Sequence, residues 1–244
     1  MPSLYLVRHA QASFGAADYD RLSEIGHLQA RRLGTYFATR GIGFAHAWCG
    51  TLRRQRETLA GVVDGLRADG QAPPSVQAHP GFDEYDPHPL LLAHAAHGGA
   101  PAGAATDAAS LSDPAAARRA HFRLLRDALL CWARGDCARS GHRSFGEFQR
   151  DAHAAFEQAW RGLRDAATRA PHGDLLIVSS GGAIAAILAR HLGMPDPGFV
   201  ALNLEAYNTG VAEFRIGTNA VHLIGINAIA HLDTPQGRAL VTHA

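Results

Sequence analysis

The segment that most constrains the fold is a short apolar run near the N-terminus that ends abruptly in two polar residues. The run extends from Leu4 to Val7 and is followed by Arg8 and His9. An uninterrupted apolar run of this length is typical of a strand that is buried on both faces in a parallel sheet. Because ligands bind outside the carboxyl ends of such strands, we expect Arg8 and His9 to lie at a functional site.

Arg8 and His9 have the chemistry needed to bind and attack a phosphoryl group. A guanidinium offers a planar fork of donors to phosphate oxygens, and a neutral imidazole is a nucleophile near pH 7. The pair alone also has a plainer interpretation, in which Arg8 is a surface residue and His9 a hydrogen-bonded histidine at a strand end. The rest of the chain decides between the two.

Length and charge limit the class of protein. The 244 residues are within the range of a single α/β domain. The formal net charge of +1 argues against a nucleic-acid surface or a polybasic membrane anchor. No apolar run is long enough to span a bilayer, and the N-terminus shows no signal-peptide pattern. We therefore expect a cytoplasmic protein without nucleic-acid or membrane partners, and the oligomeric state stays open.

The chain contains no lysine, so all of its 23 basic residues are arginines. This excludes a Schiff-base lysine, a P-loop lysine and a lysine general base. Phosphate recognition must then rely on arginine, histidine and backbone N–H groups.

Neither the cysteines nor the histidines show the spacing of a metal site. The three cysteines lack a C-x-x-C pair, which predicts reduced thiols. His88, His94 and His97 have no spacing that puts two of them on one helix face with a carboxylate. We therefore expect no metal and no cofactor. The cysteines are Cys49, Cys131 and Cys137.

Strand and helix patterns alternate along the chain, and capping and stop residues mark several of the helix boundaries. Ser23 and Thr51 are expected helix N-caps, Asp113 is the N-cap of a third helix, and Gly41 and Gly135 are expected stops. The capping box Ser144-x-x-Glu147 opens a fourth helix and residues 183–192 form a fifth. The expected strands cover residues 44–49, 73–78, 174–178, 209–216 and 220–226, the last two as a hairpin. The tail from His231 is expected to be loosely held.

Three arginines lie at the start of the helix that follows Thr51. Arg53, Arg54 and Arg56 gain nothing there from the helix dipole, which favours anions, so an anionic ligand is their natural complement. For any one of them, a solvated basic face is the plainer interpretation.

Two further segments carry candidate chemistry. Asp83, Glu84 and Asp86 provide either a general acid or merely an acidic surface turn. The turn at residues 179–182, Ser-Ser-Gly-Gly, joins a buried strand to a helix and can present free N–H groups to an anion. Small residues also suit any tight turn of this kind.

Taken together, these motifs resemble the histidine phosphatase superfamily, which has the phosphoglycerate mutase-like fold. The segment Val7 to Ala10 is similar to the family's strand that ends in Arg-His-Gly. Residues 50–58 are similar to its Ser-x-Leu-x-Arg-Ala-x-x-Thr motif, which selects Arg54 from the three arginines. The other similar segments, in the family's order, are residues 22–30 (Leu-Thr-x-x-Gly-x-x-Gln-Ala), 82–84 (Leu-x-Glu), 178–182 (Val-Ser-His-Gly-Gly) and 227–232 (Asn-x-x-x-His-Leu).

The resemblance implies a three-layer α/β sandwich, with a mostly parallel central sheet flanked by helices and a helical insertion. A single domain would cover residues 1–244, with an insertion or lid at about 86–113. The implied activity is that of a metal-independent phosphomonoesterase for a small molecule, with a phosphohistidine on His9 and Glu84 as the general acid. The implied phosphoryl-binding residues are Arg8, Arg54, Ser180 and Gly181.

Departures from the family pattern keep alternatives open. Ala10 stands where glycine is usual, and Ser180 stands at the place of a second histidine, where its neutral hydroxyl is a weaker donor. The alternatives are a non-catalytic protein that binds phosphorylated ligands and a phosphoglycerate-type mutase. A serine hydrolase is disfavoured because Ile177 and Val178 occupy the places where a nucleophile elbow needs glycine. The substrate is not indicated.

Overall fold

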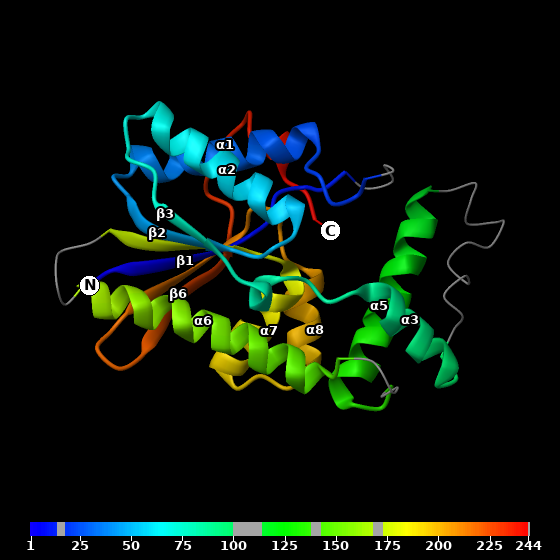
Figure 1. The fold of residues 1–244 in the computed structure, drawn as a ribbon. Helices are drawn as coiled ribbons and strands as arrows, with labels where there is room; N and C mark the ends of the chain where they lie inside the picture. Colours follow the sequence, from blue (N-terminus) through cyan, green and yellow to red (C-terminus); the bar gives the residue numbers. More distant parts are fainter. Residues whose placement is uncertain (14–17, 100–113, 138–142, 168–172, 244) are drawn as a thin grey trace.

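The computed structural model describes residues 1–13, 18–99, 114–137, 143–167 and 173–243. In this part of the chain a mixed sheet has the strand order β3-β2-β4-β1-β5-β6 (Figure 1). Four neighbouring strands are parallel, and β5 and β6 form an antiparallel hairpin beside β1. The strands are β1 (Ser3–Arg8), β2 (Phe44–Cys49), β3 (Ser75–Ala78), β4 (Asp174–Ser179), β5 (Val211–Ile216) and β6 (Val221–Ala228).

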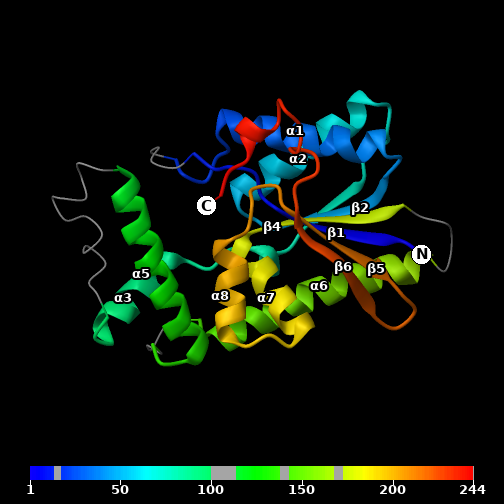
Figure 2. The same cartoon turned by 180° about the vertical axis from the view of Figure 1, so that it is seen from behind.

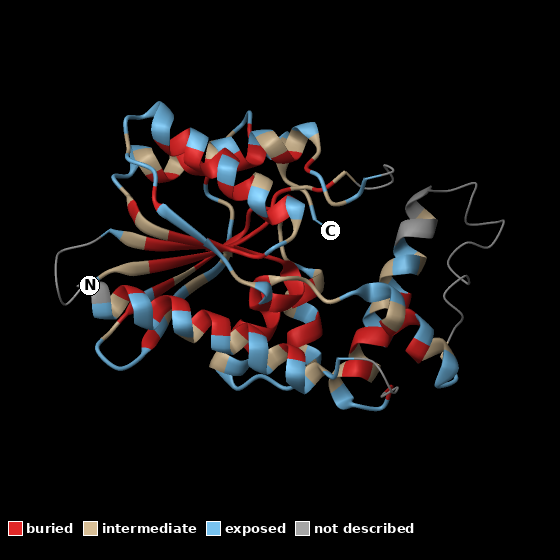
Figure 3. Cartoon of the chain, viewed as in Figure 1, coloured by how far each residue is buried: buried red, intermediate tan, exposed pale blue. Residues whose placement is uncertain are grey.

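The apolar runs of the sequence form the centre of this sheet. The side chains of Leu4, Leu6 and Val7 in β1 are fully buried, as are those of residues 175–178 in β4 (Figure 3). The edge strand β3 is exposed along its length, and β6 is mostly exposed or half-buried. The predicted strand that carries Arg8 and His9 is thus confirmed as a central strand whose carboxyl end lies between β4 and β5.

Helices cover both faces of the sheet, which confirms the predicted three-layer fold. One layer is formed by α1 (Glu24–Thr39) and α2 (Arg53–Ala68), and the other by α6 (Phe145–Ala167), α7 (Gly181–Leu192) and α8 (Asp196–Leu204). The apolar side chains of the first layer pack in one cluster with β2, and those of the second pack with Phe214 and Ile177. No helix of the described residues is long and apolar enough to cross a membrane.

Two more helices lie beside the sandwich, near the end of the sheet that carries the site. They are α3 (Pro87–Ala96) and α5 (Pro114–Arg134), and they pack against each other (Figure 1). Trp132 of α5 contacts the ring of Tyr85, at 5.6 Å between centroids. The first part of the expected lid is therefore helix α3, whereas residues 100–113, including the expected cap Asp113, lie outside the described residues.

Three expectations from the sequence are wrong. Thr51 does not cap α2, because Leu52 is the N-cap residue and Thr51 is bound instead to the Asp83 carboxylate. The tail after β6 is not loosely held, since Leu232 is fully buried and Gln29 of α1 binds the Leu240 carbonyl (Figure 2).

The third error concerns the cysteines. Cys131 and Cys137 form a disulfide between the end of α5 and the turn that follows it, whereas Cys49 is free and buried. Their separation of six residues carries no familiar signal, so the pairing depends on how the chain turns after Gly135, which has a φ of +79°.

Candidate functional site

The backbone of His9 is held from both sides at the carboxyl end of β1. Its N–H donates to the Ser179 carbonyl at 2.8 Å, which continues the pairing of β1 with β4. Its carbonyl accepts a hydrogen bond from the Asn208 side chain at 3.2 Å. The next N–H, that of Ala10, donates to Thr58 Oγ1 of α2 at 2.9 Å. These bonds fix the position from which the imidazole projects.

The hydrogen bonds of His9 define a neutral imidazole in which Nε2 is the unprotonated nitrogen. Nδ1 lies 2.8 Å from the Ala10 carbonyl, to which it can only donate, and Nε2 accepts from Arg54 Nε at 3.2 Å. The residue is only 4% exposed. Burial, together with the charges of Arg8 and Arg54, holds the pKa of His9 well below its usual value.

Arg54 alone of the three arginines at the start of α2 reaches His9. It is buried and also forms an ion pair of 2.6 Å with Asp20, whereas Arg53 and Arg56 are exposed. Asp20 lies in the loop before α1, and the sequence analysis did not single it out. This carboxylate fixes one end of the guanidinium while its Nε lies against the imidazole.

Arg8 has a hydrogen-bonding group that no described residue satisfies. One terminal nitrogen donates to the Ala206 carbonyl, but Nε is buried and has no partner within the described part of the chain. The side chain is 5% exposed, and burial lowers its pKa. A buried, unsatisfied donor on a cation costs free energy, and an anion beside it would remove that cost.

The three carboxylates of residues 83–86 bind different partners, and only one of them lies in the cluster around His9. Asp83 binds Thr51, and Asp86 is the N-cap of α3, where it accepts from the His88 N–H at 2.9 Å. Only Glu84 faces the site, where both of its oxygens accept from the Gly182 N–H, at 3.0 and 3.2 Å. Burial raises the pKa of Glu84, although the Gly182 N–H and the charges of Arg54 and Arg8 oppose this.

The turn between β4 and α7 places Ser180 next to this cluster. Ser180 is fully buried and is the N-cap residue of α7, but its side chain does not cap the helix. Its Oγ accepts instead from Gln55 Nε2 at 2.8 Å. The following Gly181 is buried, and a Cβ there would lie 3.4 Å from Arg8 Nε. The expected anion site is thus partly occupied by the Glu84 carboxylate, which takes the Gly182 N–H.

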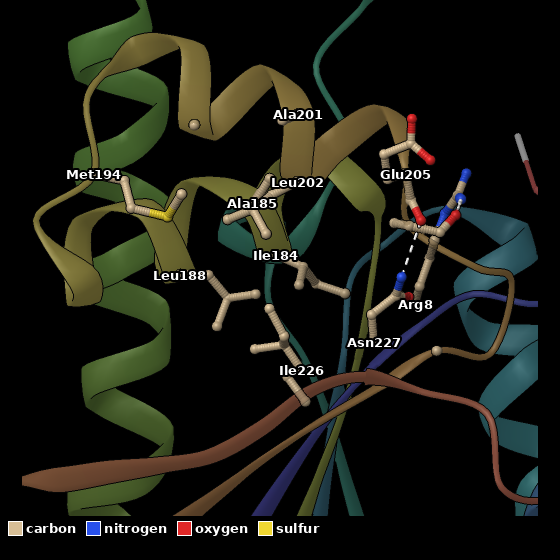
Figure 4. A pocket seen from close by; sticks show the side chains of 14 residues that line it. Arg8, Ile184, Ala185, Leu188, Met194, Ala201, Leu202, Glu205, Ile226 and Asn227 are labelled. Carbon is tan, nitrogen blue, oxygen red and sulfur yellow. Dashed lines mark hydrogen bonds between the residues drawn. The ribbon is translucent and has the colours of Figure 1, made fainter.

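A cavity of about 310 Å³ lies to one side of the cluster, between α7, α8 and the β5–β6 hairpin. Its wall is largely apolar, with Ile184, Leu188 and Ile226 among its lining residues (Figure 4). Arg8 is the one residue that it shares with the cluster, because His9, Arg54, Glu84 and Ser180 do not line it.

One group of described residues brings possible metal ligands together, and it is remote in sequence from the cluster. The ligand atoms of His94, Cys131 and Cys137 lie within 4.8 Å of one another. Both sulfur atoms are bonded to each other in the disulfide, so neither is a thiolate. His94 Nδ1 is buried without a partner among the described residues.

Comparison with solved structures supports the fold. The α-ribazole phosphatase of Shigella flexneri is 18% identical, with a TM-score of 0.58 and coverage of 93% of this chain and 97% of its own. A mycobacterial glucosyl-3-phosphoglycerate phosphatase is also 18% identical, with a TM-score of 0.58 and coverage of 93% of this chain and 99% of its own. The phosphoserine phosphatase of Entamoeba histolytica, solved with 3-phosphoglyceric acid, is 17% identical. Its TM-score is 0.57, and the match covers 95% of this chain and 100% of its own.

Comparison with curated proteins by sequence gives no match. The model of one protein family, described as branch 1 of the histidine phosphatase superfamily, matches residues 4–89 and 121–229, which include every residue of the cluster around His9. The chain therefore belongs to the histidine phosphatase superfamily.

Proposed function

We propose that this protein is a metal-independent phosphomonoesterase for small molecules, which works through a phosphohistidine on His9. The observation that carries the proposal is the state of His9. It is a buried, neutral imidazole whose Nε2 lone pair lies against Arg54, and the same cluster holds Arg8 Nε, which no described residue accepts from. A neutral nucleophile between two cations suits attack on an anionic phosphoryl group.

The first step transfers the phosphoryl group to His9. Nε2 attacks phosphorus, and the bond between phosphorus and the leaving oxygen breaks. Arg54 Nε–H turns from Nε2 to a phosphoryl oxygen, and Arg8 Nε gains the acceptor that it lacks. The two guanidiniums stabilise the charge that spreads over the phosphoryl oxygens, and Glu84 protonates the leaving oxygen.

The second step releases phosphate. Glu84, now ionised, removes a proton from water, the water oxygen attacks phosphorus, and the bond to Nε2 breaks. The raised pKa of Glu84 keeps more of it protonated in the mildly acidic range, and the lowered pKa of His9 keeps the imidazole neutral there. Both shifts therefore favour the forms that the first step needs.

The comparisons support the class of substrate. Similar structures include an α-ribazole phosphatase, a glucosyl-3-phosphoglycerate phosphatase and the phosphoserine phosphatase of Entamoeba histolytica, which was solved with 3-phosphoglyceric acid and, as a mutant, with phosphoserine. One observation favours a second candidate function, which is binding of such ligands without turnover. Ser180 offers a neutral hydroxyl in the cluster, and this is a weaker donor to phosphate than a charged group.

The test is hydrolysis of p-nitrophenyl phosphate with a chelator present. We expect native turnover that falls by at least about 10³-fold in His9→Ala, because the nucleophile is lost. His222→Ala, which removes an exposed histidine of β6, is the control and should keep full activity. Quenching of the native enzyme in an alkaline denaturant should trap a phosphoryl group on His9, which mild acid then releases. Activity that survives in His9→Ala would refute the proposal, and vanadate binding without any turnover would favour the second candidate.

A further inference from the structure

Among the described residues, the side chain that binds Ser180 is Gln55, which is fully buried and has no part in the mechanism above. It lies in the first turn of α2, next to Arg54, and is 0% exposed. Its Oε1 accepts from the Leu52 N–H at 3.1 Å, and its Nε2 donates to the Phe82 carbonyl at 2.7 Å and to Ser180 Oγ at 2.8 Å. Each polar atom of this amide therefore has a partner.

The direction of the Gln55–Ser180 hydrogen bond determines what the hydroxyl can do. An amide N–H can only donate, so Ser180 Oγ is the acceptor and its own proton remains free to be donated elsewhere. Among the described residues no acceptor takes that proton. Ser180 follows Ser179, whose carbonyl binds the His9 N–H, so Ser180 comes directly after the strand that pairs with β1 beside the nucleophile.

The absence of a side chain at Gly50 leaves room for the Gln55 amide. A Cβ at Gly50 would lie 1.9 Å from Gln55 Oε1 and 2.5 Å from Asp83 Oδ1, so a larger residue there would displace the amide and the neighbouring carboxylate. In the family motifs quoted above, Gly50, Gln55 and Ser180 stand where serine, alanine and histidine are usual. Three departures from those motifs therefore meet at one point of the structure.

We propose that Gln55 is a positioning residue that orients the Ser180 hydroxyl as a hydrogen-bond donor to the phosphoryl group on His9, with Gly50 providing the space for its amide. This inference rests on the proposed function and deepens it, because it assigns the neutral donor that completes the phosphoryl site. Ser180 contacts the transferred group, whereas Gln55 acts through Ser180.

The test compares Ser180→Ala, Gln55→Leu, their double variant and Gly50→Ala. The quantities to measure are kcat and KM with p-nitrophenyl phosphate and, by calorimetry, the affinity for orthovanadate, which mimics the pentacoordinate phosphorus of the transition state. Each single variant should lower kcat by about 10- to 100-fold with little change in KM, and weaken vanadate binding about tenfold. The double variant should be no worse than the worse single variant, because both changes remove the same donor.

Gln29→Leu is the matched control for loss of a buried amide. Gln29 is also fully buried, and it binds the Gln11 N–H, the Leu240 carbonyl and the Thr242 hydroxyl. It should lose thermal stability as Gln55→Leu does, while keeping its kcat and its vanadate affinity. This comparison separates a positioning role from a merely structural one.

The outcomes separate this inference from the proposed function. If Gln55→Leu lowers stability but leaves kcat and vanadate affinity unchanged, or if the losses of the two single variants multiply, the inference is wrong. Native protein that binds vanadate in the expected pattern without hydrolysing the ester would overturn the phosphatase proposal alone. A vanadate affinity that is constant across the series, or no vanadate binding by native protein, would overturn the inference.

Discussion

At the scale of single residues, Gly182 tests the role of Glu84 most directly. A Cβ at this position would lie 2.2 Å from Glu84 Oε1 and 2.5 Å from the ring of Tyr85. Gly182→Ala should therefore push the carboxyl group away from the leaving oxygen. We expect kcat to fall by about 10²-fold for an alkyl phosphate, whose leaving group needs a proton, and by less for p-nitrophenyl phosphate.

Gly162→Ala is the control for this prediction. Gly162 lies in the exposed part of α6, and a Cβ there would meet nothing within 4 Å. Since alanine is the better helix former, this variant should be as active as the native protein and slightly more stable. Equal losses for alkyl and aryl esters in Gly182→Ala would contradict the assignment of Glu84 as the proton donor.

At the scale of helices and strands, features with local signals were predictable from the sequence. Ser23 accepts from the Gly26 N–H as the N-cap of α1, and Ser144 and Glu147 form the predicted capping box of α6. Their hydrogen bonds join residues three apart, so both partners lie within one short stretch of sequence and can be recognised together. The tail after His231 was mispredicted because its partners, such as Gln29, lie about 200 residues away in the chain.

The same distinction applies to the cluster around His9. Arg8, His9, Arg54 and Glu84 were found because strand ends and family motifs identify them. Asp20, Gln55 and Asn208 were missed. Each binds a cluster residue from another element, so its role depends on how the layers pack; Gln55 departs from a family motif, but that departure does not reveal its partner.

The disulfide at the end of α5 allows a prediction about stability at this scale. Cys131 and Cys137 close a short loop, so we expect the bond to contribute at most about 2 kcal/mol to the free energy of unfolding. The double variant Cys131→Ser/Cys137→Ser should lower Tm by several degrees and keep the kcat of native protein. Protein purified without reductant and denatured should show one reactive thiol, that of Cys49; three would contradict the pairing.

At the scale of the whole molecule, the last buried histidine connects the C-terminal segment to the site. His231 Nε2 lies 2.8 Å from Thr209 Oγ1, which donates to the Asn208 carbonyl at 2.6 Å, and the Asn208 amide binds the His9 carbonyl. Because the Thr209 proton is used in this way, His231 must donate through Nε2. Thr209 has a φ of +57°, which is unfavourable for a β-branched residue, so these contacts stabilise a strained turn.

This arrangement makes stability depend on pH. Burial, with a smaller effect of Arg32, lowers the pKa of His231 to about 4 from its ordinary value of 6.5. The unfolded chain therefore takes up a proton at higher pH than the folded chain does, and stability that is fully present above pH 6.5 is lost as the pH falls towards 4. The difference of about 2.5 pKa units corresponds to about 3 kcal/mol at pH 4, and His9, whose pKa is also lowered, acts in the same direction.

Urea unfolding of native protein and of His231→Gln at several pH values between 7.5 and 4 measures this dependence. Glutamine keeps an N–H that can donate to Thr209 but does not titrate, so the variant should start less stable and lose less free energy over this range. Carboxylates titrate in both proteins, and the difference between the two curves therefore isolates the imidazole. Parallel curves would show that His231 is not the group whose protonation destabilises the fold, and would direct attention to His9, for which His9→Gln gives the same comparison.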